Sequence, residues 1–337
     1  MTVLPAVLAS VAGSIIDRLG ARSTLQWVAL IGLAVNAAYL ATHSLTGFMT
    51  IRVLEGLIPV GAYAAAPALI MATTSPERRG RAMAFWSTYT PVGVATGLAL
   101  SGSFAGTGEW RGGYLVHLAL FAVLALTSPL LPRVPQAVLR ATTGRPGLFS
   151  VWTQAGPLRL SLTFATLIVM GFGMTTIYPE WFARQHATEV GHASNILSVA
   201  TLVMIAGGFG AGALLARGWR DARLLAGIVI AASLISLPLF APGLHESVRI
   251  VALIVWMLAQ GAAIAVVVGA LPRVVADPMQ GAAAAGLLSQ LAALVTFVTP
   301  LIWQPILQAG YWPGFVAVVV VVAVGAWLIF PRWSGSD

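Results

Sequence analysis

The sequence contains no cysteine and no lysine, and charged residues of any kind are few. Its 337 residues include 18 basic residues, all of them arginine, and 10 acidic ones, so that charged residues make up 8% of the chain. The absence of cysteine excludes disulfides, thiolate nucleophiles and cysteine-ligated metals. The absence of lysine excludes a lysine Schiff base and a Walker A loop, which needs a lysine on the ATP phosphates. Primary ATP-driven pumping by this chain is therefore excluded.

Hydrophobic residues make up 58% of the chain, which is above the range of soluble domains. A soluble fold of this length needs a mostly polar surface, and so few charged residues cannot cover one. A surface that faces lipid needs no such cover. The composition therefore predicts a polytopic membrane protein.

The hydrophobic residues gather in runs that are long enough to cross a bilayer as helices, which takes about 20 apolar residues. The runs are too long for the strands of a barrel, so the predicted fold is all-α. The first basic residue is Arg18, and a signal peptide would carry basic residues earlier, so the first run is also interpreted as a span. Eleven spans are predicted, near residues 2–16, 24–42, 47–73, 82–105, 113–131, 160–180, 193–216, 222–241, 248–272, 281–308 and 311–331.

The arginines gather on one side of these spans. One side holds 14 of them, the other holds only Arg111, Arg184 and Arg249, and Arg52 lies inside a span. Short cytoplasmic loops retain basic residues, so the C-terminus is expected in the cytoplasm. The expected location of the protein is a bacterial inner membrane. The arginines form no contiguous patch, so no nucleic-acid partner is expected.

The longest polar segment, residues 132–159, separates five spans from six. The predicted domains are an N-terminal helical bundle over 1–131, a cytoplasmic linker loop over 132–159, a six-helix bundle over 160–331 and a cytoplasmic tail over 332–337.

An internal repeat relates the two halves. The segment from Gly13 to Arg22 aligns with the segment from Gly212 to Asp221, and each closes a span and opens a basic turn. In the second half this segment follows the second span of that half, whereas in the first half it follows the first span present. This offset predicts that the first half lacks its first helix. Parallel repeats of this kind are a known construction of transporters.

The segment from Gly13 to Arg22 resembles the first signature of the major facilitator superfamily, G-x-L-A-D-R-x-G-R-R. It departs from that signature at Ile16 and Ala21. The resemblance extends over essentially the whole chain and implies two helical bundles that alternately open a site to either face of the membrane. It also implies that the signature works as a conformational latch, the alternative being a solvated turn that only sets topology. The matching residues are Gly13, Asp17, Arg18, Gly20 and Arg22.

Two further motifs resemble signatures of the same family. Arg52-Val-Leu-Glu55-Gly56 is similar to R-x-x-Q-G, with glutamate in place of glutamine. Gly93, Gly97 and Gly102 are similar to part of an antiporter motif whose proline is Leu98 here. Close helix packing is the alternative interpretation of these glycines.

Arg52 and Glu55 lie one helical turn apart within an apolar run, so both face the same side of the helix. Ionisable groups at such depth are costly and mark ion or substrate paths, which makes this pair the candidate coupling site. A structural ion pair is the alternative. Other polar and aromatic residues of the spans are candidates for lining a central cavity, namely Asn36, Tyr39, Tyr63, Tyr89, Asn195, Gln260 and Gln290.

The predicted function is secondary active transport of a small molecule, coupled to protons or another ion. The alternatives are a drug or metabolite efflux antiporter, a non-transporting membrane receptor or scaffold, and a non-functional truncated transporter. No catalytic constellation and no metal-ligand spacing is found among the five histidines, so neither an enzyme nor a cofactor is expected. The expected state is a monomer in the lipid bilayer.

Overall fold

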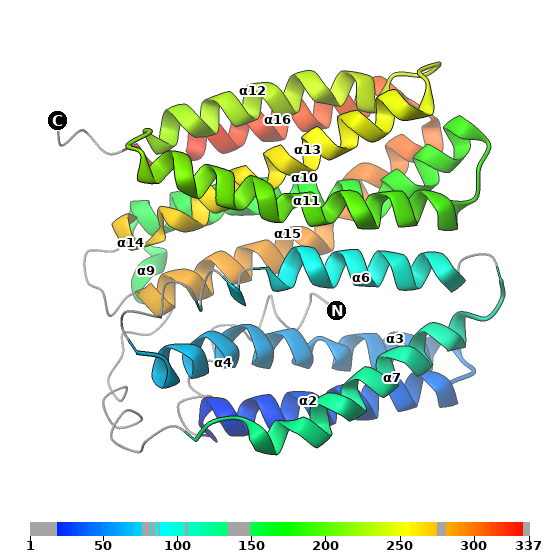
Figure 1. Cartoon of the computed structure of the whole chain (residues 1–337), viewed down its shortest axis with the longest axis vertical. Coiled ribbons are helices and arrows are strands. Elements are labelled where there is room, and N and C mark those ends of the chain that lie inside the picture. Colours follow the sequence, from blue (N-terminus) through cyan, green and yellow to red (C-terminus); the bar gives the residue numbers. More distant parts are fainter. Residues whose placement is uncertain are drawn as a thin grey trace. The chain divides into compact units, whose positions relative to one another are not determined.

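The structure of the protein, a computed structural model, describes residues 19–75, 82, 85–86, 88–104, 107–133, 149–274 and 281–332. Every regular element within these ranges is a helix, as predicted (Figure 1). Contacts between the helices divide the chain into two compact units. Unit 1 contains α2 (Ala21–Ala41), α3 (Leu45–Glu55), α4 (Leu57–Thr73), α7 (Trp110–Thr127) and the 3₁₀ turn η1 (Ser128–Leu130).

Unit 2 contains the remaining long helices. It includes α6 (Tyr89–Phe104) from Thr90 onward and α9 (Phe149–Trp152) from Ser150 onward. Its other helices are α10 (Ala155–His186), α11 (Val190–Ala216), α12 (Asp221–Phe240), α13 (Glu246–Gly269), α14 (Leu271–Val274), α15 (Gly281–Ala309) and α16 (Trp312–Ile329). The domain boundary predicted from the sequence is the linker 132–159, and that boundary stays a prediction.

Nine helices within the described residues are long and apolar enough to cross a membrane. They correspond to nine of the eleven predicted spans, with ends that differ by a few residues. The predicted span 2–16 lies outside the described residues, and only part of the span 82–105, mainly α6, is described. An all-helical membrane fold is therefore confirmed, and the count of eleven helices is not.

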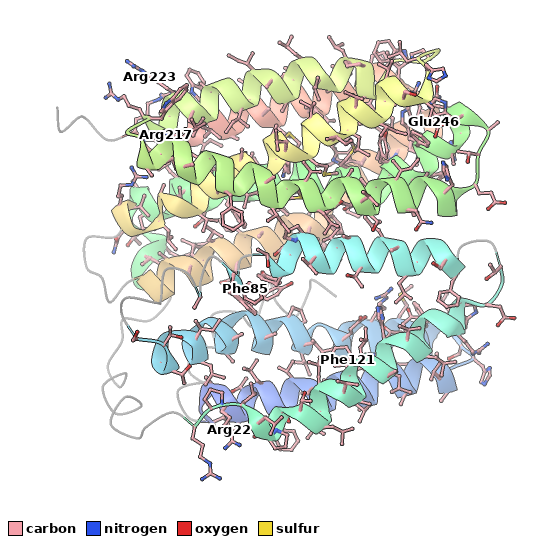
Figure 2. The ribbon with its side chains drawn as sticks, viewed as in Figure 1. Arg22, Phe85, Phe121, Arg217, Arg223 and Glu246 are labelled. Carbon is pink, nitrogen blue, oxygen red and sulfur yellow. The ribbon has the colours of Figure 1, made fainter. Side chains whose placement is uncertain are left out.

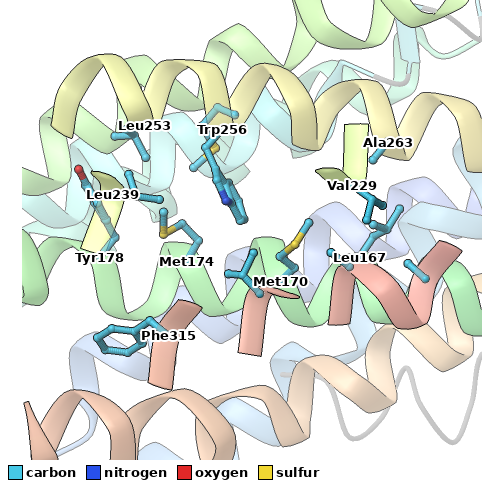
Figure 3. Close-up of a cluster of buried hydrophobic side chains, with 14 of the residues drawn as sticks. Leu167, Met170, Met174, Tyr178, Val229, Leu239, Leu253, Trp256, Ala263 and Phe315 are labelled. Atoms are coloured by element: carbon cyan, nitrogen blue, oxygen red, sulfur yellow. The ribbon is translucent and has the colours of Figure 1, made fainter. Parts of the chain in front are cut away.

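The core of unit 2 is a continuous cluster of large apolar side chains. Met170 and Met174 on α10 pack with Trp256 on α13 and Phe315 on α16, and all four are buried (Figure 3). Lipid tails are as apolar as these side chains, so packing rather than exclusion of water holds the helices together. The shape of the contacts therefore decides which helices are neighbours.

Glycines set the closest of these contacts. A Cβ atom added to Gly207 of α11 would lie 2.0 Å from the carbonyl oxygen of Leu258 on α13. A Cβ atom added to Gly261 of α13 would lie 2.0 Å from the carbonyl oxygen of Met204 on α11. Because both obstacles are backbone atoms, two glycines allow these helices to touch backbone to backbone.

We expect Gly207→Ala and Gly261→Ala each to lower the free energy of unfolding by about 1–3 kcal/mol, because the added methyl group must push α11 and α13 apart. Gly210→Ala is the matched control on α11, since nothing lies within 4 Å of its Cβ position. The measurement is the thermal unfolding of the purified variants in detergent. Equal stability of all three variants would contradict this account of the contact.

Candidate functional site

The candidate coupling pair lies at the end of α3. This helix begins after Ser44, whose hydroxyl oxygen accepts a hydrogen bond from the backbone N–H of Gly47 at 3.0 Å. It ends at Glu55, where Gly56 separates it from α4. Arg52 donates to Glu55 Oε2 at 2.8 Å, and the Glu55 side chain is only 13% exposed. The spacing of three residues thus brings the pair together as predicted.

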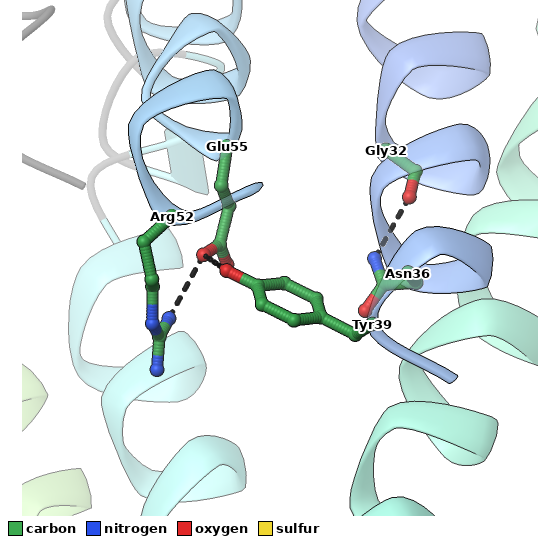
Figure 4. A network of polar contacts seen from close by, with 5 residues as sticks. All are labelled: Gly32, Asn36, Tyr39, Arg52 and Glu55. Carbon is green, nitrogen blue, oxygen red and sulfur yellow. Dashed lines mark hydrogen bonds and ion pairs between the residues drawn. The ribbon is translucent and has the colours of Figure 1, made fainter. Parts of the chain in front are cut away.

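Tyr39 joins this pair from a different helix. Its side chain is fully buried on α2, and its hydroxyl donates to Glu55 Oε2 at 2.8 Å (Figure 4). A single carboxylate oxygen therefore accepts one hydrogen bond from a cation and one from a phenol. Hydrogen bonds that involve a charged group are stronger than neutral ones, so these two contacts fix the position of the Glu55 side chain between α2 and α3. Any loss of the Arg52 contact would leave a carboxylate that is held by Tyr39 alone.

Aromatic rings surround the arginine of this cluster. The Arg52 guanidinium lies 5.7 Å from the centroid of the Tyr39 ring and 5.6 Å from that of Phe48, both within the range of cation–π attraction. The Tyr114 ring of α7 lies 4.3 Å from the Tyr39 ring. The charge of Arg52 is thus balanced by one carboxylate and the faces of neighbouring rings.

A cavity of about 540 Å³ in unit 1 shares two of these aromatic residues, since Phe48 and Tyr114 line the cavity and also contact Tyr39. This cavity is more open than enclosed, and its volume is in the range of small-molecule sites. The lining residues include the basic side chains Arg111 and His43 but no acidic one. They are Thr42, His43, Ser44, Leu45, Phe48, Trp110, Arg111 and Tyr114.

Arg111, a basic residue that lines this cavity at the start of α7, is held in place by two neighbours. The Arg111 guanidinium lies 4.4 Å from the centroid of the Trp110 ring and donates to the carbonyl oxygen of Thr42 at 3.3 Å. The arginine distribution predicts only a topological role for Arg111. Its contact with the end of α2 could not be read from the sequence, because 69 residues separate Arg111 from Thr42.

The residues of the predicted latch are only partly described. Gly13, Asp17 and Arg18 lie outside the described residues. Gly20 precedes α2 with a φ of 82°, a conformation that favours glycine. Arg22 donates to the carbonyl oxygen of Pro129 at 2.8 Å, so it links the start of α2 to the turn after α7 within unit 1. The latch itself stays a prediction.

The glycines of the antiporter-like motif differ in their surroundings. Nothing lies within 4 Å of the Cβ positions of Gly93 and Gly97. A Cβ atom on Gly102 would lie 3.0 Å from the carbonyl oxygen of Gly191 on α11. Further along the same two helices, Ser198 of α11 donates to the carbonyl oxygen of Ala95 at 2.7 Å. Gly102 thus allows α6 and α11 to pack closely.

The candidate cavity residues do not share one environment. Asn36 and Gln260 are buried and donate to the carbonyl oxygens of Gly32 and Leu167, both at 2.8 Å. Tyr63 and Tyr89 are exposed, with ring centroids 5.4 Å apart. Asn195 is exposed and Gln290 is half-buried. Of these candidates, Tyr39 forms a hydrogen bond with the coupling pair.

An ion pair between α12 and α14 was not predicted. The carboxylate of Asp221, buried at the start of α12, accepts a hydrogen bond from Arg273 of α14. Asp221 ends the second copy of the internal repeat, which is the signal that could have pointed to it. The pair links the start of α12 to α14 within unit 2.

Comparison with known families decides the class of the protein. Residues 1–300 match the sequence profile described as Major Facilitator Superfamily. The chain belongs to this superfamily. It is thus a transmembrane protein of a transporter family, in keeping with its nine apolar helices in the described residues.

Relatives in the superfamily include two proteins of Mycobacterium tuberculosis, from strains CDC 1551 / Oshkosh and H37Rv. They are described as the uncharacterized MFS-type transporters MT3072 and Rv2994. Each is 24% identical to this chain over 193 residues, which are 57% of this chain and 43% of the relative. The match thus spans less than half the length of these relatives.

Solved structures show the same fold. A bacterial homolog of the human lysosomal transporter Spinster, in an inward-facing and unoccupied conformation, has a TM-score of 0.74 and 16% identity, over 99% of this chain and 90% of its own. A D-xylose–proton symporter has a TM-score of 0.72 and 16% identity, over 98% of this chain and 86% of its own. At such identities the likeness establishes the fold alone.

We expect the Arg52–Glu55 contact to appear as a coupling free energy of about 1 kcal/mol in a double-mutant cycle of Arg52→Met and Glu55→Gln. Either single change leaves a charged partner near the apolar interior, whereas the double change removes both charges. Thermal unfolding in detergent measures the cycle. The control is a cycle on the exposed pair Arg184 and Glu180, for which solvent screening predicts a value near zero. Equal values for the two pairs would contradict the prediction.

Proposed function

We propose that this chain is a secondary active transporter that moves a small molecule by alternating access, coupled to protons or another ion. Membership of the superfamily supports transport in general. The observation that supports coupling is the cluster of Tyr39, Arg52 and Glu55, because it places a carboxylate that accepts two hydrogen bonds between the apolar helices α2 and α3. Ionisable groups in such places are typical of ion and proton paths.

The coupling step that we propose is a proton exchange at Glu55. When Glu55 is ionised, it holds Arg52 and Tyr39. When it gains a proton, its attraction to the guanidinium falls, and Arg52 becomes free to attract an anionic group. Charge at Glu55 and anion binding at Arg52 would then exclude one another, which is a physical basis for coupling.

The cavity beside this cluster supports a solute with an aromatic or apolar body and no positive charge. Its lining combines three aromatic rings with Arg111 and His43, and the lining residues include no acid. A cationic solute would meet like charge there. A D-xylose–proton symporter shares the fold, so proton coupling is known to occur in this fold.

One observation favours export of the solute. Gly102 permits the close packing of α6 and α11, and it lies in the segment that resembles the antiporter motif. An efflux antiporter is therefore the alternative form of the same proposal. The latch residues Asp17 and Arg22 would bias the two access states in either direction of transport.

The proposal is tested with purified protein in proteoliposomes that are exposed to a mixture of small metabolites with an imposed pH gradient. Mass spectrometry of the washed vesicles then reports which solutes move. We expect at least one solute to be concentrated or depleted only when the protein and the gradient are both present. If no solute differs from protein-free liposomes under either direction of the gradient, the transporter proposal is wrong.

For a solute found in this way, we expect Glu55→Gln to remove the dependence of transport on the pH gradient while substrate binding remains. The substitution preserves the size of the side chain and removes the group that gains and loses the proton. Glu180→Gln is the matched control, because Glu180 is exposed and pairs with Arg184 at the end of α10. Unchanged gradient dependence in Glu55→Gln would show that Glu55 is a structural residue.

The arginine distribution also predicts that the C-terminus and the 132–159 segment are cytoplasmic. Reporter fusions after Trp333 and within the segment should both give the cytoplasmic signal. A periplasmic signal at either position would overturn the proposed orientation.

A further inference from the structure

The connection between α11 and α12 carries three arginines and a tryptophan. It belongs to the second copy of the internal repeat, which the proposed transport function does not use. Arg217, Trp219 and Arg220 lie between the two helices, and Arg223 lies in the first turn of α12. Figure 2 shows Arg217 and Arg223 at the same end of unit 2. These four residues are called the arginine turn below.

Backbone hydrogen bonds give the arginine turn a compact form. Gly218 has a φ of 87°, which favours glycine, and its N–H donates to the carbonyl oxygen of Leu215 at 3.0 Å. The N–H of Trp219 donates to the carbonyl oxygen of Leu214 at 3.2 Å. Such bonds are a common way to end a helix at a left-handed glycine. The chain thus reverses over a short stretch, and the four side chains of the arginine turn are exposed.

The acidic residue beside the arginine turn is already engaged. Asp221 is buried at the start of α12 and accepts a hydrogen bond from Arg273 of α14. The first copy of the repeat has Asp17 inside its turn, whereas the second copy has Ala216 at the aligned position. The second copy therefore places three arginines together without an acid between them.

The three arginines also have no partner in the described part of the chain. They form neither an ion pair nor a side-chain hydrogen bond with any described residue. Arg159, another exposed arginine of unit 2, instead donates to the carbonyl oxygen of Ile329 at 2.9 Å, at the end of α16. The positive charge of the arginine turn is thus not balanced within the described residues.

The length of α12 places the arginine turn at the membrane surface. α12 has 20 residues and is apolar enough to cross a membrane. At 1.5 Å per residue it is about 30 Å long, which matches the hydrocarbon core of a bilayer. Arg220 and Arg223, at the start of this helix, therefore lie at the level of the lipid headgroups rather than in bulk water. Trp219 is 55% exposed beside them, and tryptophan is enriched at this level of membrane proteins.

We propose that the arginine turn binds the headgroups of anionic phospholipids in the folded protein. Guanidinium groups form strong, charge-assisted hydrogen bonds with phosphate oxygens. A membrane surface presents many phosphates, so the three arginines need not converge on one ligand. A topological role requires only that arginines lie on one side of the membrane during insertion, whereas this proposal predicts a local preference for anionic lipid after folding.

The absence of cysteine from the chain allows a local test. Ala216→Cys places a single thiol at the exposed end of α11, next to the arginine turn. A fluorophore on this thiol is quenched by lipids that carry a nitroxide near the headgroup. Quenching is compared between nitroxide-labelled phosphatidylglycerol, which is anionic, and phosphatidylethanolamine, which is zwitterionic, in reconstituted vesicles. We expect a local preference of about fivefold or more for phosphatidylglycerol, since each arginine near an anionic surface adds about that factor.

Variants of the labelled protein assign the preference to the arginine turn. The combined change of Arg217→Gln, Arg220→Gln and Arg223→Gln should reduce the preference to less than about twofold. Lysine at the same three positions should retain most of it, because the charge remains. Arg184→Gln is the control for the loss of an arginine, since Arg184 is exposed at the end of α10 and pairs with Glu180. Should the glutamine variant not reconstitute, Arg223→Gln alone carries the test, with an expected loss of at least half of the preference.

Three results would overturn the proposal. The first is equal quenching by the two lipids in the unsubstituted arginine turn. The second is an unchanged preference in the glutamine variants, because other basic residues would then attract the lipid. The third is loss of the preference when soluble glycerol 3-phosphate is added at matched ionic strength, because the arginine turn would then bind phosphate from solution. Each measurement is made without a transported solute, so the proposal is tested separately from the transport function.

Discussion

The structure depends on one constraint, which is that a bilayer offers no water to satisfy a buried hydrogen-bonding group. Helices meet this constraint for the backbone, and several polar side chains of the described spans meet it by bonding to carbonyl oxygens. Asn36 bonds to its own helix, whereas Gln260 and Ser198 bond to neighbouring ones. Such bonds are short-range and directional, so they add specificity to helix contacts that apolar packing alone would leave weakly defined.

The same constraint explains how each unit uses arginine. In unit 1, Arg111 donates to the carbonyl of Thr42, which caps the end of α2. In unit 2, Arg249 donates to the carbonyl of Ala241, which caps the end of α12. A cation at a helix C-terminus interacts favourably with the exposed carbonyls and the helix dipole. Both arginines thus join a helix start to a helix end, in addition to the topological role that the sequence predicts.

Much of the fold could be predicted from the sequence, because span length and composition follow from the thickness of the bilayer. The Arg52–Glu55 contact could also be predicted, since residues three apart share a helix face. The part of Tyr39 in that cluster could not, because hydrophobic periodicity does not say which helices are neighbours, and Tyr39 was one of seven cavity candidates. The sequence also did not predict that Arg249 is fully buried, because the positive-inside rule counts arginines without regard to the helix face on which they lie.

The central proposal is that Glu55 exchanges a proton and that its carboxylate holds Arg52 and Tyr39 when it is ionised. Infrared difference spectroscopy of the protein in lipid, between neutral and mildly acidic pH, tests this claim most directly, because a protonated carboxyl group has its own C=O stretching band. We predict a band that appears on acidification and shifts in frequency in Tyr39→Phe. It should be absent in Glu55→Gln and present in Glu180→Gln. A spectrum that is identical in wild type and Glu55→Gln would contradict the claim and identify the cluster as a structural ion pair.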